Sequence, residues 1–330
     1  MHEKSSASNE KAGVTRRTFL GTTLLTGAAF FAGGSDLIFG AESSASSNIA
    51  TNSTWQLGGD LKVNRLGFGA MRITGEGIWG WPPDRGNALK VLRHAVDLGV
   101  NLIDTADAYG PETSELLIAE ALYPYPKGLV IATKGGLTRP GRGEWVPDGR
   151  PEHLKQAVDD SLKRLRLERI DLYQLHRIDP KVPMEESLGA IKEMKDVGKI
   201  RHVGLSNVEP EEIQRAQKIV PIASVQNQYN IEDRKSENAL TYCEKNSLGF
   251  MPWSPIGGGR GLKAGDALEA AAKNHGVTVV QLALAWLLHR SPVMLPIPGT
   301  SSVAHLEENV AAEKLKLTPE EWKSIDALAG

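Results

Sequence analysis

The sequence predicts an α/β protein built as a single (β/α)8 barrel, or TIM barrel, with an N-terminal β-hairpin. Eight short runs rich in β-branched and apolar residues alternate with amphipathic helical segments, which is typical of a parallel sheet covered by helices. The rival architecture, a doubly wound open sheet, normally carries a Gly-x-Gly-x-x-Gly turn after its first strand. The matching stretch, Gly67-Phe68-Gly69-Ala70, lacks that spacing. The barrel is therefore favoured.

The elements follow from the local pattern in chain order. A hairpin is predicted from 54–57 and 61–63 around the turn Gly58-Gly59-Asp60, because glycine tolerates the positive φ of a tight turn. The eight strands are then expected at 65–71, 100–104, 129–134, 170–176, 200–206, 223–226, 249–253 and 293–297.

The helices between these strands are recognised from apolar residues spaced three and four apart. Leu154, Val158, Leu162 and Leu165 form one such face behind Pro151, a residue favoured in the first turn of a helix. The segments 187–194 and 280–287 show the same period. Helices are thus expected over all three stretches.

The composition indicates one globular domain with a sizeable core. Of 330 residues, 41% are hydrophobic and 24% are charged, and the formal net charge is -2. This balance provides no broad cationic face, so nucleic acid is not expected as a partner. Cys243 is the single cysteine, which excludes an intrachain disulfide, and its thiol is expected to be inert packing in a helix.

Residues 1–45 are predicted to be a twin-arginine signal peptide. Arg16 and Arg17 precede an apolar run, 19–34, that is shorter than the roughly 20 apolar residues a membrane span needs. Cleavage is expected near Ala41 to Ala45, followed by a linker over 46–54 and the barrel over 55–330. These features predict a periplasmic or otherwise extracytoplasmic protein without a stable membrane span after signal removal. The alternative is an amphipathic N-terminal helix of a cytoplasmic protein.

Four reactive side chains are predicted at neighbouring strand ends. Asp104 closes the second strand, Tyr109 follows in its loop, Lys134 closes the third strand and His176 closes the fourth. Side chains at the carboxyl ends of barrel strands converge on one face, where active sites are found. Singly, each residue has a plainer explanation: a turn cap, turn packing, a solvated lysine or a half-buried imidazole. The coincidence of all four favours a site.

These residue types suit the reduction of a carbonyl group. A hydride is delivered to the carbonyl carbon while a proton donor protonates the developing alkoxide. An unperturbed tyrosine, with a pKa of about 10, is too weak an acid. We therefore expect the Lys134 ammonium to lower the pKa of Tyr109, and Asp104 to keep Lys134 charged and oriented. His176 is expected to donate a hydrogen bond to the substrate oxygen.

The segments around these residues resemble a known family. The stretches 101–110 (NLIDTADAYG), 132–134 (ATK) and 171–176 (DLYQLH) look like signature segments of the aldo-keto reductases, and the likeness runs from about Trp55 to Ala312. The resemblance implies a catalytic tetrad of Asp104, Tyr109, Lys134 and His176. It also implies reduction of aldehydes or ketones to alcohols, with Tyr109 as general acid and NAD(P)H entering first.

The same resemblance implies where the nicotinamide half of the cofactor lies. Ser206, Asn207 and Gln226 correspond to residues that bind the carboxamide, and Trp253 to the aromatic that stacks on the ring, an arrangement that selects one ring face. The glycine run 257–261 resembles the loop over the pyrophosphate, where small residues let backbone N–H groups approach. The remaining implied contacts in this segment are Ser254, Pro255, Ile256 and Gly258.

The adenine half is implied to bind near the start of a late helix. The implied contacts there are Gly299, Thr300, Ser301 and His305, and at the positions of Gly299, Ser301 and His305 many family members carry Lys or Arg for the 2′-phosphate of NADP. Hydroxyls and a helix N-terminus also bind phosphate, so NADP is expected, with NAD as the alternative. Glu308 and Asn309 resemble the adenine contacts. Export of a folded, loaded protein would require a tight cofactor site.

The substrate and the function class remain less sharply defined. Trp79, Trp81 and Trp145 lie in predicted loops on the active face, which indicates a pocket for an apolar or aromatic carbonyl compound or simply packed loops.

A monomer without a metal site is expected. Two alternatives stay open: a cofactor-sensing module like the potassium-channel β subunits that the family resembles, and a barrel aldolase using Lys134 as a Schiff-base nucleophile.

Overall fold

The structure is a computed structural model that describes residues 53–258, 261–263 and 265–328. The predicted export signal, its cleavage position and residues 46–52 of the linker lie outside the described residues. Extracytoplasmic localisation therefore stays a prediction. Across the described ranges, no helix combines the length and the apolar character that crossing a membrane requires.

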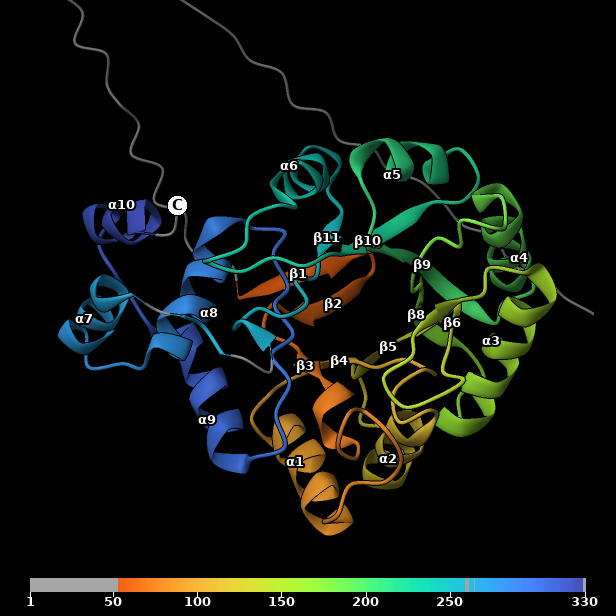
Figure 1. Ribbon diagram of the computed structural model, residues 1–330, viewed down its shortest axis with the longest axis horizontal. Coiled ribbons are helices and arrows are strands. Elements are labelled where there is room, and N and C mark those ends of the chain that lie inside the picture. The colour runs from red at the N-terminus through yellow and green to blue at the C-terminus, as the bar shows by residue number, and fades with distance from the viewer. Residues whose placement is uncertain (1–52, 259–260, 264, 329–330) are drawn as a thin grey trace, which may run out of the picture. The chain divides into compact units, whose positions relative to one another are not determined.

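A curled parallel sheet forms the centre of the fold (Figure 1). Its seven strands lie side by side, and each strand is hydrogen-bonded to the strands next to it. Their bounds are β3 (Phe68–Gly69), β4 (Leu102–Asp104), β5 (Val130–Gly135), β8 (Ile170–Leu175), β9 (Ile200–Ser206), β10 (Ile222–Gln226) and β11 (Gly249–Phe250).

The segment 293–298 joins the two edges of this sheet and closes a (β/α)8 barrel. Leu295 N donates to Phe250 O at 2.7 Å on the β11 side, and Gly67 N donates to Pro296 O at 2.9 Å on the β3 side. The eighth strand expected over 293–297 is nevertheless not a strand, because only an isolated parallel bridge, Phe250 to Met294, forms. Pro296 and Pro298 lack the N–H donors that a regular ladder needs.

Two other predicted strands are shorter than expected. The first, predicted over 65–71, is confined to Phe68–Gly69 because the chain turns at once into the 3-10 helix η1 (Ala70–Ile73). The seventh, predicted over 249–253, ends at Phe250, and Trp253 keeps only a bridge to Gln228. The other five strands agree with the sequence prediction to within two residues.

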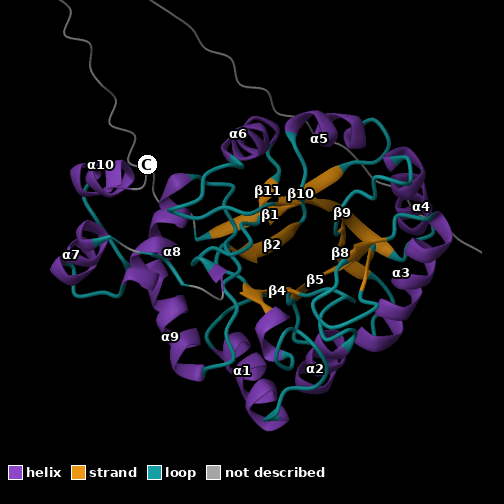
Figure 2. Cartoon of the chain, viewed as in Figure 1, coloured by secondary structure: helices purple, strands orange, loops and turns teal. Residues whose placement is uncertain are grey.

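Helices surround the barrel as an outer ring, which Figures 1 and 2 show from the same direction. The predicted helices at Pro151, 187–194 and 280–287 are confirmed as α3, α4 and α8. The described helices are α1 (Arg85–Asp97), α2 (Thr113–Leu122), α3 (Pro151–Leu165), α4 (Met184–Asp196), α5 (Pro210–Gln217), α6 (Glu237–Asn246), α7 (Asp266–Asn274), α8 (Val279–Arg290), α9 (Val303–Ala311), η3 (Ala312–Lys314) and α10 (Pro319–Leu328).

The hairpin of β1 (Thr54–Leu57) and β2 (Leu61–Asn64) covers the end of the barrel at which the strands begin. Leu57, Leu61 and Val63 share one apolar cluster with Leu102 and Val130, which open β4 and β5. This packing leaves the opposite end, where the strands finish, as the face available for chemistry.

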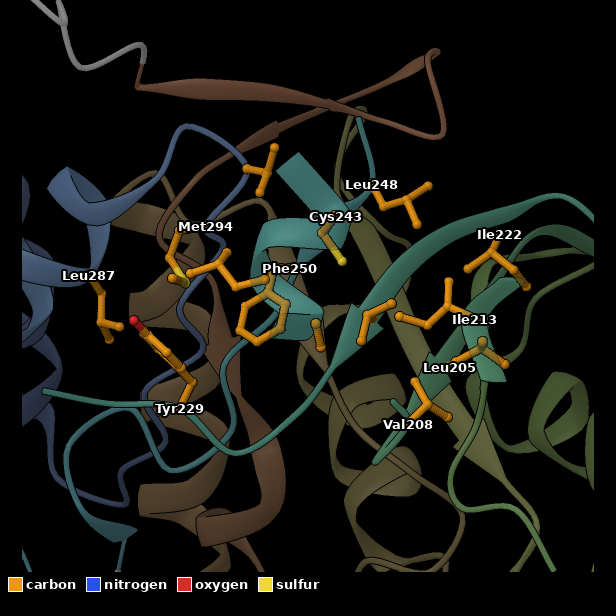
Figure 3. Packing of buried hydrophobic residues seen from close by; sticks show 14 of the residues in the cluster. Leu205, Val208, Ile213, Ile222, Tyr229, Cys243, Leu248, Phe250, Leu287 and Met294 are labelled. Atoms are coloured by element: carbon orange, nitrogen blue, oxygen red, sulfur yellow. The ribbon is translucent and has the colours of Figure 1, made fainter. Parts of the chain in front are cut away.

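The largest apolar cluster lies between the barrel and the helices that cover β8 to β11. Figure 3 shows part of it, with Phe250 from β11 edge to face with Tyr229 and near Met294 and Leu287. Cys243 in α6 belongs to this cluster and is fully buried. Burial raises the pKa of its thiol to about 12, which agrees with the inert packing expected from the sequence.

Candidate active site

The four predicted catalytic residues come together at the carboxyl ends of β4, β5 and β8. Asp104 is the last residue of β4, Lys134 is the penultimate residue of β5 and His176 directly follows β8. Tyr109 lies in the loop after β4 and is bound to α2 through Ser114 N, which donates to Tyr109 O. All four side chains are buried, so their mutual interactions are poorly screened by water.

Lys134 is the centre of this group. Its fully buried Nζ donates to Asp104 Oδ2 at 2.7 Å, to Thr105 O at 2.7 Å and to Tyr109 Oη at 3.3 Å. An ammonium uses its three donors in this way when it has no contact with water. Burial lowers the pKa of Lys134, but Asp104 and Tyr109 outweigh that effect and the net pKa is raised. Lys134 is therefore a cation.

Asp104 is held by two buried amides as well as by Lys134. Gln174 Nε2 in β8 donates to Asp104 Oδ1 at 3.1 Å, and Gln226 Nε2 at the end of β10 donates to the same oxygen at 2.9 Å. Gln226 had been assigned to the nicotinamide carboxamide from the family resemblance, whereas here its amide nitrogen is used by Asp104. Gln174 was missed, although a glutamine inside an otherwise apolar strand is a signal that could have found it.

The pKa of Tyr109 differs from the expectation. Burial raises the pKa of Tyr109, and the nearby Lys134 ammonium opposes this rise without overcoming it. The predicted lowering of the Tyr109 pKa is therefore wrong as a net effect, because the loss of hydration of the phenolate outweighs the attraction of the Lys134 cation. Tyr109 keeps its proton at neutral pH, as a proton donor must.

His176 completes the group as a neutral imidazole. Burial, reinforced by the positive charges of Lys134 and Arg177, holds the pKa of His176 well below its usual range. Its ring meets the ring of Tyr109 edge to face, with 5.7 Å between the centroids. His176 Nδ1 has no hydrogen-bond partner within the described ranges. The rings of His176 and Tyr109 are therefore direct neighbours in the site.

The residues assigned to the nicotinamide lie at adjoining strand ends. Asn207 has a left-handed backbone (φ 59°) directly after β9, and its Nδ2 donates to Ser206 Oγ at 2.9 Å and to His176 O at 3.2 Å. Trp253 Nε1 donates to Asn207 Oδ1 at 3.1 Å, which fixes the indole beside the tetrad. Ser206, Asn207 and Trp253 therefore form one connected group.

The segment after Trp253 forms a tight turn that requires glycine. Gly258 has a φ of 65°, and a Cβ at this position would lie 2.6 Å from Ser254 Oγ. Pro255 is buried, whereas Ile256 packs against the large apolar cluster. With no side chain in the way, backbone N–H groups of such a turn can approach an anionic oxygen. The pyrophosphate contact expected for this loop stays a prediction.

The residues assigned to the adenine half have distinct surroundings. Thr300 is buried, whereas Ser301 and His305 are exposed beside the N-terminus of α9. Glu308 accepts a hydrogen bond from Thr278 Oγ1 at 2.5 Å, and Asn309 is buried. Exposed hydroxyl and imidazole groups at a helix start suit a phosphate monoester. Within the described ranges, no group of three or more His, Cys, Asp or Glu side chains is placed to hold a metal ion.

Aromatic side chains line the approach to the tetrad. Trp145 follows the short hairpin strand β6 (Leu137–Thr138) and precedes its partner β7 (Val146–Pro147). Its ring lies edge-on to those of Tyr109 and His176, at centroid distances of 6.3 Å and 6.4 Å. Trp81 is instead 46% exposed and lies against Arg85. Trp145 thus belongs to the site, whereas Trp81 packs against Arg85 at the surface.

Known proteins with similar sequences cover almost the whole barrel. Residues 65–329 match the model of the family described as the aldo/keto reductase family. An uncharacterised oxidoreductase of Schizosaccharomyces pombe is 52% identical over 268 residues, which are 81% of this chain and 87% of that protein. Pyridoxine 4-dehydrogenase of Escherichia coli is 44% identical over 277 residues, which are 82% of this chain and 96% of that protein.

The fold of this chain is also similar to that of a solved structure of the family. A crystal structure of an aldo/keto reductase from Klebsiella pneumoniae in complex with NADP and acetate is similar with a TM-score of 0.71. The two sequences are 28% identical, and the match covers 84% of this chain and 95% of that chain.

Proposed function

The chain belongs to the aldo/keto reductase family, and from that premise we propose that it reduces aldehydes or ketones to alcohols with Tyr109 as the general acid. Membership makes the chain an NAD(P)-dependent oxidoreductase. The single observation that supports the proposed roles most directly is the position of Lys134 Nζ, which contacts both Asp104 and the Tyr109 hydroxyl.

The proposed reaction uses the tetrad to move one proton. When bound, the reduced nicotinamide supplies hydride to the carbonyl carbon. His176 donates a hydrogen bond to the carbonyl oxygen and orients it toward Tyr109. As charge develops on that oxygen, Tyr109 Oη gives up its proton, and the Lys134 ammonium stabilises the phenolate left behind. Asp104 keeps the lysine charged and in place.

NADP is the proposed cofactor, with NAD as the alternative. The Klebsiella pneumoniae relative was solved with NADP. This chain carries no Lys or Arg between residues 299 and 309, so Ser301, His305 and the N–H groups at the start of α9 would hold the 2′-phosphate. Trp253 and Asn207 would hold the nicotinamide. The ratio of kcat/KM for NADPH to that for NADH measures this preference directly.

Two other functions receive less support. A cofactor sensor without turnover is not favoured by relatives that are themselves named as an oxidoreductase and a dehydrogenase. A Schiff-base aldolase needs a neutral, accessible lysine, whereas Lys134 is fully buried, cationic and paired with Asp104.

The test is steady-state loss of NADPH absorbance with a panel of aldehydes and ketones. Pyridoxine with NADP⁺ is included in the oxidative direction, because a relative is named for its dehydrogenation. We expect turnover with at least one carbonyl compound. Tight NADPH binding without turnover on any of them would favour the sensor instead. Borohydride trapping of a substrate adduct on Lys134 would favour the aldolase.

A further inference from the structure

Arg139 is a buried cation beside the active site that the proposed reaction does not use. It directly follows β6, and only 9% of its surface is exposed. Its guanidinium lies over the ring of Trp145 at 3.7 Å from the centroid and near the ring of Trp79 at 5.4 Å. An arginine between two indoles makes cation–π contacts that orient both rings.

The same side chain also connects two active-site loops. Arg139 Nη1 donates to Ile78 O at 3.1 Å and to Ala108 O at 3.0 Å. Ile78 precedes Trp79, and Ala108 precedes Tyr109. A parallel bridge between Trp79 and Gly110 joins these loops again. Arg139 therefore links both tryptophans to the segment that carries the Tyr109 hydroxyl.

We propose that Arg139 is a positioning and specificity-determining residue, which holds Trp145 and Trp79 as an aromatic wall beside Tyr109 and so favours planar, aromatic carbonyl substrates. The proposal rests on the proposed carbonyl reduction and deepens it by naming the substrate class. Trp145 transmits the effect, because its ring contacts both Tyr109 and His176. Flat aromatic substrates gain most from such a wall, since their rings can pair with the indoles in offset-stacked or edge-to-face arrangements.

The remaining donors of Arg139 are not used within the described fold. Nε and Nη2 have no hydrogen-bond partner among the residues that the structure describes. Burying a guanidinium with two unused donors is unfavourable, and replacing buried charges with apolar residues of similar volume is often neutral or stabilising. A costly buried group next to reacting side chains is typical of a functional constraint.

The experiment compares Arg139→Met with the wild type on benzaldehyde and propanal. Methionine keeps much of the length of arginine but has neither the donors nor the planar cation. We expect kcat/KM for benzaldehyde to fall about tenfold relative to that for propanal, through KM, because a cation–π wall is lost. The NADPH Kd should not rise, and the Tm should not fall. Arg139→Lys should recover part of the selectivity, since an ammonium can still reach the two carbonyls.

The matched control is Arg142→Met in the same loop. Arg142 is exposed, and its Nη2 donates to Glu76 O at 2.7 Å. This variant should retain the wild-type selectivity. Equal losses of kcat/KM for both aldehydes in Arg139→Met, or a fall in Tm parallel to the loss of activity, would overturn the proposal in favour of a structural role.

A second measurement separates this inference from the proposed function. Binding of benzaldehyde to the protein–NADP⁺ complex, followed by calorimetry, needs no turnover. Arg139→Met should bind it about tenfold more weakly than the wild type. Absence of turnover in the wild type would refute carbonyl reduction, whereas equal affinities of the wild type and Arg139→Met would refute the role of Arg139.

Discussion

At the scale of single residues, the candidate site depends on the hydrogen-bond acceptors that offset the burial of the Lys134 ammonium. Lys134 has no exposed surface, yet three acceptors surround its Nζ. The phenol oxygen of Tyr109 is one of these three acceptors. Lys134 therefore affects the acidity of Tyr109 mainly when negative charge forms on that oxygen. The raised pKa of Tyr109 is consistent with a donor that releases its proton only as the substrate oxygen gains charge.

Replacement of Tyr109 by phenylalanine tests this role. Tyr109→Phe removes only the hydroxyl, so we expect kcat to fall by about 10²–10⁴-fold, the usual contribution of a general acid. The NADPH Kd should stay close to that of the wild type, since the hydroxyl contacts the substrate and not the cofactor.

Tyr125→Phe is the control, because Tyr125 Oη donates to Leu165 O outside the site. Wild-type kcat in Tyr109→Phe would exclude this residue as the acid.

At the scale of elements, the closure of the barrel depends on a close approach between two glycines. A Cβ at Gly299 would lie 2.5 Å from Gly69 O, and a Cβ at Gly69 would lie 2.7 Å from Ile297 O. The irregular segment 293–298 can therefore lie against β3 only where side chains are absent. Gly299 was predicted as a cofactor contact, and it also has this packing role.

Gly299→Ala should destabilise the protein by about 1–3 kcal/mol, as overpacking against fixed backbone does. Urea unfolding measures the change. Gly189→Ala is the opposite case, because Gly189 lies inside α4 with no atom within 4 Å of an added Cβ. That substitution should stabilise by about 0.5–1 kcal/mol. An unchanged free energy of unfolding in Gly299→Ala would show that the segment can move away at no cost.

At the scale of the whole molecule, the two ends of the barrel have different chemistry. The hairpin closes one end with apolar residues, and a surface group of Asp60, Arg201 and His202 holds its turn in place. The other end contains the buried ionisable residues of the site, including the neutral His176. Burying these groups makes the stability of the entire fold depend on pH.

The direction in which stability changes with pH can be derived from the pKa of His176. Its folded pKa lies well below the value of about 6.5 in an unfolded chain. The unfolded state therefore binds the proton more strongly, and stability is lost as the pH falls below about 6.5. In His176→Gln, the free energy of unfolding should fall less steeply between about pH 6.5 and pH 5.5, by up to about 1.4 kcal/mol.

The control for this measurement is His305→Gln, whose side chain is exposed at the start of α9. Urea unfolding of the three proteins at both pH values gives the comparison. Identical pH dependence in the wild type and His176→Gln would contradict a neutral, buried imidazole at this position.

Sequence alone determined the alternation of strands and helices and the four residues of the tetrad. Both follow from local pattern: apolar periodicity marks each element, and parallel topology brings the ends of successive strands to one face. Asp104, Lys134 and His176 each lie at such an end, so their proximity required no knowledge of packing.

Only the tertiary structure decided which side chains support that tetrad and how the barrel closes. The hydrogen bonds of Gln174 and Gln226 to Asp104 join residues 70 and 122 positions apart, and Arg139 meets Trp79 and Trp145 from different loops. The net pKa of Tyr109 likewise depends on how completely water is excluded from its hydroxyl. Such contacts depend on the packing of distant segments, whereas periodicity describes only neighbours along the chain.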